Sequence, residues 1–227
     1  MSGGAGAAGG PPNLRVVRHA LLSDRLARLR DAATPSGAFR RLLGEVGAIL
    51  AVEATRALDE AETAVATPLA TMRHRVLAAP EPCLVPVLRA GLGLLEGVRR
   101  LMPEAPVGHI GLLRDEATLR PREYLVRLPR DLGRRGALLL DPMLATGGSA
   151  VAAVARLKEA GAPWVRMLCV VAAPEGVARL GAAHPEVEVF AAALDERLDA
   201  RGFIVPGLGD AGDRCFGTGA EGRRQGA

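Results

Sequence analysis

The chain has 227 residues, of which 49% are hydrophobic and 24% charged, and its formal net charge is +4. This composition is ordinary for a globular protein with a substantial core, and the charge fits a polyanionic ligand without selecting a small phosphate over nucleic acid. No stretch approaches the roughly 18 consecutive apolar residues of a membrane span, so no membrane association is expected.

Three cysteines, Cys83, Cys169 and Cys215, lie far apart and lack the spacing of metal ligands. We therefore predict a reducing compartment and no protein metal site. The opening residues have no basic segment followed by an apolar one, so they do not resemble a secretory signal, and we expect a cytoplasmic protein. Residues 1–13 and 219–227 are predicted to be disordered tails around a single domain at 14–218.

The first half of the domain combines short apolar runs with leucines at helical spacing. Leu14 to Val17 predicts a short strand, and leucines between 21 and 29 predict a helix that the Thr-Pro-Ser-Gly at 34–37 interrupts. Apolar residues then recur at helical spacing from Phe39 to Ala54. A strand at 83–88 and a helix at 92–101 follow, so the pattern is that of alternating strands and helices.

The same alternation continues along the second half. After a strand at 107–112 and a strand-like segment at 123–128, we predict strands at 137–140, 165–173 and 187–194, with helices at 151–158 and 174–180 between them. Gly161 is expected to end the first of these helices. Repeated strand–helix alternation predicts an α/β fold with a mostly parallel sheet flanked by helices.

The segment from 136 to 150, GALLLDPMLATGGSA, predicts a buried strand, a loop and the start of a helix. Thr146 to Ser149 place small hydroxyls and exposed backbone amides at the helix N-terminus, where the helix dipole favours an anion. Asp141 cannot bind a phosphate by charge, but a carboxylate there suits sugar hydroxyls or magnesium. The sequence therefore predicts a sugar phosphate as ligand.

The nine residues Asp141–Ser149, DPMLATGGS, resemble the phosphoribosyl-diphosphate motif of uracil phosphoribosyltransferases. Residues 85–93, VPVLRAGLG, are similar to the loop that holds the diphosphate in this family, with Arg89 in the binding position. Residues 113–129 resemble the family's flexible hairpin, in which Arg114 reaches the diphosphate, although Leu113 stands where tyrosine is more frequent. The resemblance implies a type I phosphoribosyltransferase fold.

The segment 202–214, GFIVPGLGDAGDR, is too rich in Gly, Pro and Asp for a regular element and is expected to be a loop. Its unblocked backbone groups suit the edge of a small planar ligand such as uracil. It resembles the C-terminal base-binding hood of the same family, with Phe203 in place of a frequent tyrosine.

The resemblance implies conversion of uracil and phosphoribosyl diphosphate into UMP and diphosphate, with Asp210, Arg89 and Arg114 as catalytic residues. Magnesium is expected to arrive with phosphoribosyl diphosphate, and a homo-oligomer is expected; activation by GTP is left open. The implied phosphoribosyl-diphosphate site consists of Arg89, Arg114, Asp141, Pro142, Met143, Leu144, Ala145, Thr146, Gly147, Gly148, Ser149 and Asp210, and the implied uracil site of Ile204, Gly209, Asp210 and Ala211.

Two alternatives remain at this stage. A related fold serves as an RNA-binding regulator of pyrimidine genes, but four Phe, one Tyr and one Trp offer few platforms for stacking unpaired bases, so no nucleic-acid partner is expected. Phosphoribosyltransferases for other bases are the second alternative.

Overall fold

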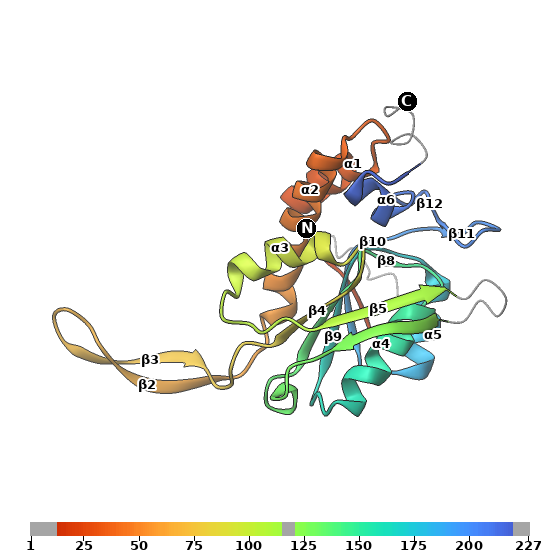
Figure 1. Cartoon of the computed structure of the whole chain (residues 1–227). Helices are drawn as coiled ribbons and strands as arrows, with labels where there is room; N and C mark the ends of the chain where they lie inside the picture. Colours follow the sequence, from red (N-terminus) through yellow and green to blue (C-terminus); the bar gives the residue numbers. More distant parts are fainter. Residues whose placement is uncertain (1–12, 115–120, 220–227) are drawn as a thin grey trace, which may run out of the picture.

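The computed structural model describes residues 13–114 and 121–219, and the rest of the chain lies outside this description (Figure 1). The predicted tails fall outside it except for Asn13 and Gly219, so the division into two tails and one domain stays a prediction. The carbonyl oxygen of Asn13 accepts a hydrogen bond from the amide of Val189 at 2.8 Å, so the main chain at Asn13 is already attached to the sheet.

A sheet of eight strands forms the centre of the described part of the chain (Figure 1). Every neighbouring pair in it is parallel except β5 and β6. The predicted mostly parallel α/β fold is therefore confirmed. In spatial order the strands are β1 (Leu14–Val16), β10 (Glu188–Leu194), β9 (Val165–Ala172), β7 (Ala137–Leu140), β4 (Cys83–Leu88), β5 (His109–Arg114) and β6 (Pro121–Arg127), and β8 (Met143–Leu144) also pairs with β9.

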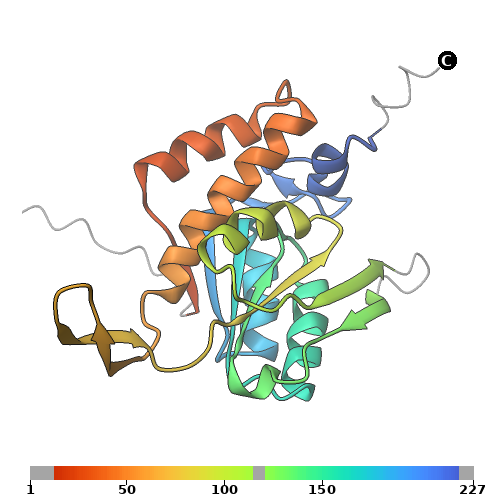
Figure 2. The same cartoon turned by 60° about the vertical axis from the view of Figure 1, so that its left-hand side comes forward.

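Helices cover both faces of the sheet (Figures 1 and 2). Side chains alternate along β7: Leu138 and Leu140 join the core under α2 and α3, whereas Ala137 and Leu139 join the core under α4 and α5. A strand buried on both faces reads as a continuous apolar run, which is why its position was predictable. The helices are α1 (Ala20–Arg30), α2 (Ser36–Thr55), α3 (Leu92–Leu101), α4 (Gly148–Glu159), α5 (Pro174–Ala183) and α6 (Ala211–Phe216), with a 3-10 turn at Leu132–Arg134.

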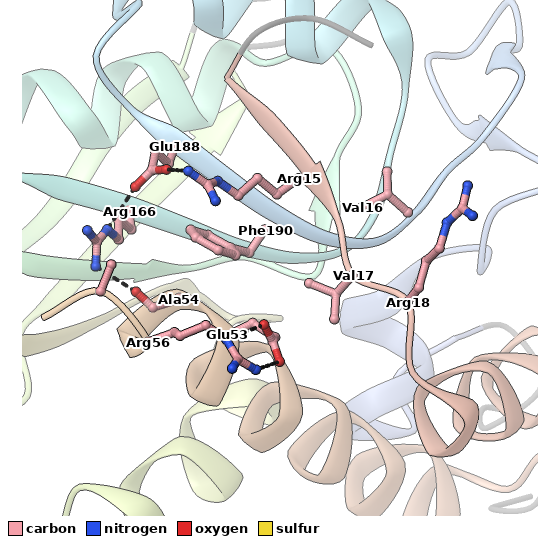
Figure 3. Close-up of a pocket in the computed structure, with 11 residues that line it drawn as sticks. Arg15, Val16, Val17, Arg18, Glu53, Ala54, Arg56, Arg166, Glu188 and Phe190 are labelled. Carbon is pink, nitrogen blue, oxygen red and sulfur yellow. Dashed lines mark hydrogen bonds and ion pairs between the residues drawn. The ribbon is translucent and has the colours of Figure 1, made fainter. Parts of the chain in front are cut away.

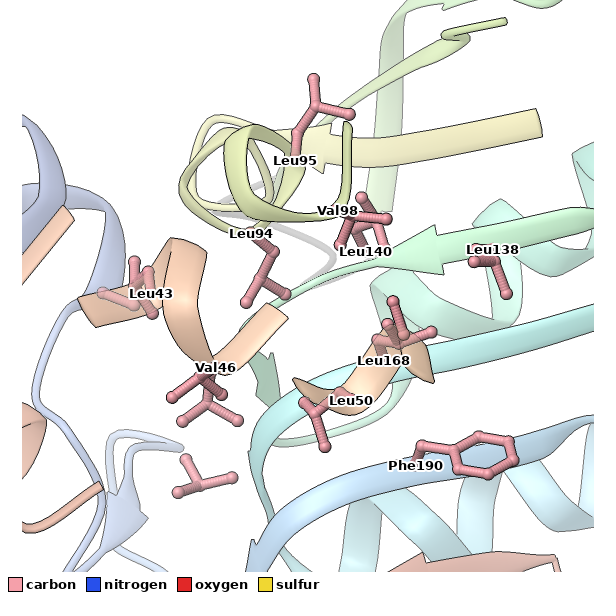
Figure 4. Packing of buried hydrophobic residues seen from close by; sticks show 14 of the residues in the cluster. Leu43, Val46, Leu50, Leu94, Leu95, Val98, Leu138, Leu140, Leu168 and Phe190 are labelled. Carbon is pink, nitrogen blue, oxygen red and sulfur yellow. The ribbon is translucent and has the colours of Figure 1, made fainter. Parts of the chain in front are cut away.

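Aliphatic side chains fill the larger core cluster. Figure 4 shows Val46 and Leu50 of α2 and Leu94 of α3 beside Leu140 and Leu168 of the sheet. All five are fully buried. Because aromatic residues are few, branched aliphatic residues supply most of the apolar surface that drives this packing.

Helices α2 and α3 cross at glycines, where their backbones touch. A Cβ atom on Gly97 of α3 would overlap the carbonyl oxygen of Gly44 in α2, and a Cβ on Gly47 would lie 2.8 Å from the carbonyl oxygen of Leu94. The close crossing brings α3 down onto α2 and therefore fixes the loop that precedes α3, which carries Arg89.

The antiparallel hairpin of β2 (Glu60–Ala66) and β3 (Thr71–Leu77) was not predicted from the sequence. It projects away from the body of the molecule in both views (Figures 1 and 2), and nearly all of its side chains are exposed. With no buried face, its sequence lacks the alternation by which strands are recognised.

The prediction that residues 202–214 form an irregular loop was wrong in part. Strand β12 (Ile204–Val205) pairs with β11 (Arg197–Leu198), and α6 begins at Ala211, within the segment. These elements are too short to show periodicity in sequence. Strands β5 and β6 form the expected hairpin, whose tip at 115–120 lies outside the described residues.

The helix crossing yields a prediction about stability. Gly97→Ala is expected to reduce the free energy of unfolding by about 2 kcal/mol or more, because the added methyl group forces the two backbones apart. Urea unfolding measures this directly. Gly37→Ala is the matched control: nothing lies within 4 Å of its added Cβ, so no loss is expected. Equal unfolding free energies for Gly97→Ala and the wild type would contradict backbone contact at the crossing.

Candidate functional site

Two of the predicted motifs meet where adjacent parallel strands end. Strands β4 and β7 pair in register from Cys83 with Ala137 to Pro86 with Leu140, and their next segments carry Arg89 and Asp141. The loop after β4 touches the end of β7, since a Cβ on Gly91 would overlap the carbonyl oxygen of Leu140. Crevices at the carboxyl ends of parallel strands are where open α/β sheets bind ligands.

The segment Asp141–Ser149 winds from β7 into the N-terminus of α4. Its N-cap residue is Gly147, and α4 begins at Gly148 with no side chain capping its first amides. Helix α5 supports the loop from behind, because a Cβ on Gly176 would overlap the carbonyl oxygen of Ala145. The uncapped amides leave hydrogen-bond donors at the positive end of the helix dipole, an arrangement that favours an anion; phosphate binding at this loop stays a prediction.

Asp141 is a half-buried carboxylate at the start of this loop. Its Oδ1 accepts a hydrogen bond from the amide of Met143 at 3.4 Å, which lowers its pKa slightly, but burial is the larger effect and raises the pKa of Asp141 to about 7. Its ionised form is therefore poorly solvated by the protein alone. Hydroxyl donors or a cation brought by a ligand would supply the missing partners.

Arg89 connects the β4 loop to the C-terminal segment. Its Nη2 lies 3.3 Å from Oδ1 of Asp213 in α6, and its Nη1 lies 3.4 Å from Oγ1 of Thr218. The hydroxyl of Thr218 also donates to Asp213 at 2.6 Å. The guanidinium remains more than half exposed, so it is both anchored and accessible to an anion. The partners Asp213 and Thr218 were not predicted from the sequence. Each is more than 120 residues from Arg89, and no local sequence pattern indicates a contact over such a separation.

The expected base-binding segment, hereafter the hood (residues 202–214), stands over this end of the sheet. Ile204 and Ala211 are buried, whereas Gly209 and Asp210 are exposed. Asp210 is the N-cap of α6: its Oδ1 accepts the amide hydrogen of Asp213 at 2.9 Å. The structure thus brings the hood beside Arg89 through α6, but gives Asp210 a local bond as well.

Arg114 is the last residue of β5, and its backbone pairs with Pro121 of β6. Its side chain lies outside the described residues, so its predicted approach to the diphosphate remains a prediction.

One hollow borders these elements, and a second lies at the amino ends of β9 and β10. One, of about 610 Å³, lies between the α1–α2 connection and the hood, and Asp210 and Asp213 line it. The other, of about 480 Å³, lies near β1 and the end of α2 (Figure 3) and contains no predicted site residue. In this second hollow Glu188 pairs with Arg15 at 2.6 Å and with Arg166 at 3.0 Å, and Glu53 pairs with Arg56 at 2.6 Å. Two carboxylates therefore offset two of the four arginine charges that line the hollow.

Among residues 13–114 and 121–219, no group of three or more acidic, histidine or cysteine side chains is arranged to hold a metal ion. The same residues include no helix long and apolar enough to cross a membrane.

The cysteines Cys83, Cys169 and Cys215 are free and buried. Burial raises the pKa of each thiol, that of Cys83 to about 11, which disfavours the thiolate at neutral pH.

A parallel sheet with an acidic, glycine-rich strand-to-helix loop, an arginine loop beside it and a C-terminal hood defines a phosphoribosyltransferase of type I. The family model described as uracil phosphoribosyltransferase matches residues 16–218 of this chain. The chain therefore belongs to the uracil phosphoribosyltransferase family, and the resemblance noted in its motifs is confirmed.

Relatives agree with the family match over nearly the whole length. A protein of Oceanobacillus iheyensis named uracil phosphoribosyltransferase is 51% identical over 206 residues, which are 91% of this chain and 99% of the relative. One of the same name from Geobacillus kaustophilus is 50% identical over 89% and 97% of the two chains. A solved structure of an Aquifex aeolicus protein superposes with a TM-score of 0.87 at 37% identity, covering 91% of this chain and 99% of that one.

The raised pKa of Asp141 predicts a pH-dependent stability. In the unfolded chain Asp141 has its ordinary pKa of 3.8, whereas in the folded protein its pKa is about 7. The contribution of Asp141 to the free energy of unfolding is therefore fully present below pH 3.8 and is lost as the pH rises through about 7. Asp141→Asn should therefore raise the melting temperature more at pH 8 than at pH 5 in thermal unfolding.

Asp131→Asn provides the contrasting control. The hydrogen bond from Arg135, whose Nε lies 2.6 Å from Oδ2 of Asp131, lowers the pKa of that carboxyl, so the substitution should lower the melting temperature at pH 8 and have less effect near pH 3. A gain for Asp141→Asn that is equal at pH 5 and pH 8 would argue against a buried, poorly solvated carboxylate.

Proposed function

We propose that the chain transfers the phosphoribosyl group of phosphoribosyl diphosphate to uracil, giving UMP and diphosphate, at the end of the sheet where β4 and β7 terminate. The observation that carries the proposal is the meeting of the Asp141–Ser149 loop, Arg89 and the hood at this end, in a chain of the uracil phosphoribosyltransferase family. A reaction between a sugar phosphate and a base needs both binding surfaces side by side.

In this proposal phosphoribosyl diphosphate lies along the β7–α4 loop. The free amides at the start of α4, from Ala145 to Ser149, hold the 5′-phosphate, and the remaining loop residues Pro142 to Leu144 shape its entrance. The carboxylate of Asp141 accepts hydrogen bonds from ribose hydroxyls, which compensates the burial that otherwise disfavours its charge. Arg89 and Arg114 bind the diphosphate, whose oxygens suit the planar guanidinium.

Uracil is read by the main chain of the hood. Ile204, Gly209, Asp210 and Ala211 offer amide and carbonyl groups, and the base presents two carbonyl acceptors and an imide donor that such groups can match. Main-chain recognition needs a fixed backbone rather than a particular side chain. It also accommodates Phe203 in place of the more frequent tyrosine, since the side chain there is partly exposed to solvent.

The chemical step forms a bond between a ring nitrogen of uracil and the anomeric carbon while the bond to diphosphate breaks. The diphosphate leaves with the electron pair, and the ring nitrogen loses its proton. The anomeric centre becomes positive in the transition state, so positioning and electrostatic stabilisation dominate. Arg89 and Arg114 stabilise the departing anion, and the carboxylate of Asp210 favours the positive centre.

We infer that magnesium enters with phosphoribosyl diphosphate rather than occupying a site of its own. Asp213 at this end is paired with Arg89 and Asp210 caps α6, and the described residues show no group of three side chains placed to hold a metal, which fits a metal held mainly by substrate oxygens. When bound, the ion would neutralise charge on the diphosphate.

We further infer a cytoplasmic enzyme that acts as a homo-oligomer. Three unpaired buried thiols fit a reducing compartment.

The β2–β3 hairpin exposes Met72, Val76 and Leu77, and apolar side chains on a projecting ribbon favour burial against a second copy of the chain. Sedimentation equilibrium over a range of protein concentrations tests the homo-oligomer. A monomeric mass at every concentration would exclude it.

A base panel tests the reaction. With phosphoribosyl diphosphate and magnesium, the protein should consume uracil and release diphosphate. It should consume cytosine and hypoxanthine far more slowly, because the hood backbone matches an imide edge that neither base presents. Orotate shares that edge but carries a carboxylate beside the reacting nitrogen, so it should also react far more slowly. Product is measured by chromatography of UMP. Rapid use of hypoxanthine or orotate without uracil would overturn the proposal, and tight sequence-selective RNA binding that UMP alters would favour a regulatory role instead.

The charge of Asp210 can be separated from its capping role. Asp210→Asn keeps an acceptor for the amide of Asp213, and Asn is as good an N-cap as Asp, so α6 and the melting temperature should be preserved. Turnover should nevertheless fall by about 10²-fold, because the transition state loses a nearby negative charge.

Asp199→Asn is the control for this experiment. The Asp199 carboxylate accepts the amide hydrogens of Arg201 at 2.9 Å and Phe203 at 2.8 Å in the neighbouring turn, but it is not among the proposed site residues. Its turnover should stay near that of the wild type. Near-normal turnover of folded Asp210→Asn would leave Asp210 with only its capping role.

A further inference from the structure

An ion pair with a buried carboxylate holds the middle of the hood. The guanidinium of Arg30, the last residue of α1, donates from Nη2 to Oδ1 of Asp195 at 2.5 Å and from Nη1 to Oδ2 at 2.9 Å. Asp195 follows β10 and its side chain is only 4% exposed, whereas that of Arg30 is 25% exposed. This bidentate geometry is the strongest form of the arginine–carboxylate interaction.

The same pair binds both peptide groups of Gly207. The amide of Gly207 donates to Oδ2 of Asp195 at 2.8 Å, and its carbonyl oxygen accepts from Nη1 of Arg30 at 2.9 Å. Both the N–H and the C=O of Gly207 are therefore held, and neither can rotate without breaking a charge-assisted hydrogen bond. We call this arrangement of Arg30, Asp195 and Gly207 the hood clamp.

The clamp acts on a turn that only glycine can form. Gly207 has φ of 61°, and a Cβ there would overlap the carbonyl oxygen of Ile204. Ile204 precedes the turn and Gly209 follows it. The clamp thus sets the direction of the backbone on both sides, at the residues that the proposed function assigns to uracil.

A second arginine ties the hood to the same end of α1. Nη1 of Arg214 donates to the carbonyl oxygens of Leu29 at 2.6 Å and Leu208 at 2.9 Å, and its guanidinium lies 4.3 Å from the ring centre of Phe39. Leu208 is the neighbour of Gly207. The end of α1 is therefore a support for the hood from two directions.

We propose that Arg30 and Asp195 are positioning residues for the base: the hood clamp holds the main chain of residues 204–211 in the geometry that reads uracil. This inference rests on the proposed function. Neither residue belongs to the β7–α4 loop assigned to phosphoribosyl diphosphate, and of residues 204–211 only Asp210 is assigned to both substrates. Loss of the clamp therefore weakens binding of uracil more than binding of phosphoribosyl diphosphate. Loss of one partner also leaves the other charge buried without compensation, which makes the hood relax rather than keep its shape.

Steady-state kinetics with both substrates varied tests the clamp, using Arg30→Ala, Arg30→Lys and Asp195→Asn. Lysine keeps the charge but not the fork that reaches Asp195 and Gly207 together, and asparagine keeps the size and one acceptor, so these variants are the milder ones if Arg30→Ala does not fold. Arg25→Ala is the matched control: Arg25 lies on the same helix, is 26% exposed, and pairs with Glu45 at 2.8 Å, away from the hood.

For Arg30→Ala the KM for uracil should rise by about tenfold or more while the KM for phosphoribosyl diphosphate stays within about twofold, and Arg30→Lys should restore part of the loss. Arg25→Ala should leave both constants near those of the wild type. An unchanged KM for uracil, or an equal rise in both constants, would overturn the positioning role. No consumption of uracil by the wild type would instead overturn the proposed function.

Amide hydrogen exchange gives a readout that is independent of activity. In the wild type without substrates, the amide of Gly207 should exchange slowly, because Asp195 accepts its hydrogen. Arg30→Ala and Asp195→Asn should accelerate this exchange, and Arg25→Ala should not. Equal rates in all four proteins would show that no clamp exists.

Discussion

The strands at the centre of the sheet are apolar on both faces, and this constraint organises the molecule. Strands β4, β7 and β9 must be covered on both sides, so α1, α2 and α3 pack on one face, α4 and α5 pack on the other, and the strands run parallel. Parallel strands end at a common edge, where their backbone no longer pairs and loops are free to vary. Arg89 and Asp141 are neighbours there because β4 and β7 are neighbours in the sheet, although 52 residues separate them in the sequence.

This placement has an energetic consequence for Asp141. The residue directly after a fully buried strand inherits an environment with little water, and a carboxylate there is hard to ionise. Burial is unfavourable to the free protein but useful to a binding site, because partners supplied by the ligand interact with the charge in a medium of low polarity. The burial that makes the charge of Asp141 destabilising in the free protein therefore also makes that charge sensitive to the presence of a polar ligand.

Sequence reasoning succeeded where the physical signal is local. Residues 137–140 and 167–172 lie in strands whose buried residues follow one another without interruption, and the loop after residue 140 was recognised from its own nine residues. The hairpin β2–β3 escaped because neither face is buried, and α6 escaped because six residues cannot display helical periodicity. The pairing of Arg89 with Thr218 and that of Arg30 with Asp195 were also not predicted. Pairs more than 100 residues apart are chosen by tertiary packing, and nothing in the sequence around Asp195 or Thr218 distinguishes them from other polar residues.

The contacts between α1 and the hood join segments separated by 177 to 185 positions along the chain. Contacts of such high sequence separation must close a long loop of chain, so their entropic cost is met only after the intervening sheet has collapsed. We therefore expect the main-chain surface for the base to mature after the phosphate-binding loop, whose strand and helix are adjacent in sequence. The two substrate surfaces would then differ in folding history as well as in chemistry, and the one read through the backbone would be the last part of the protein to acquire its native geometry.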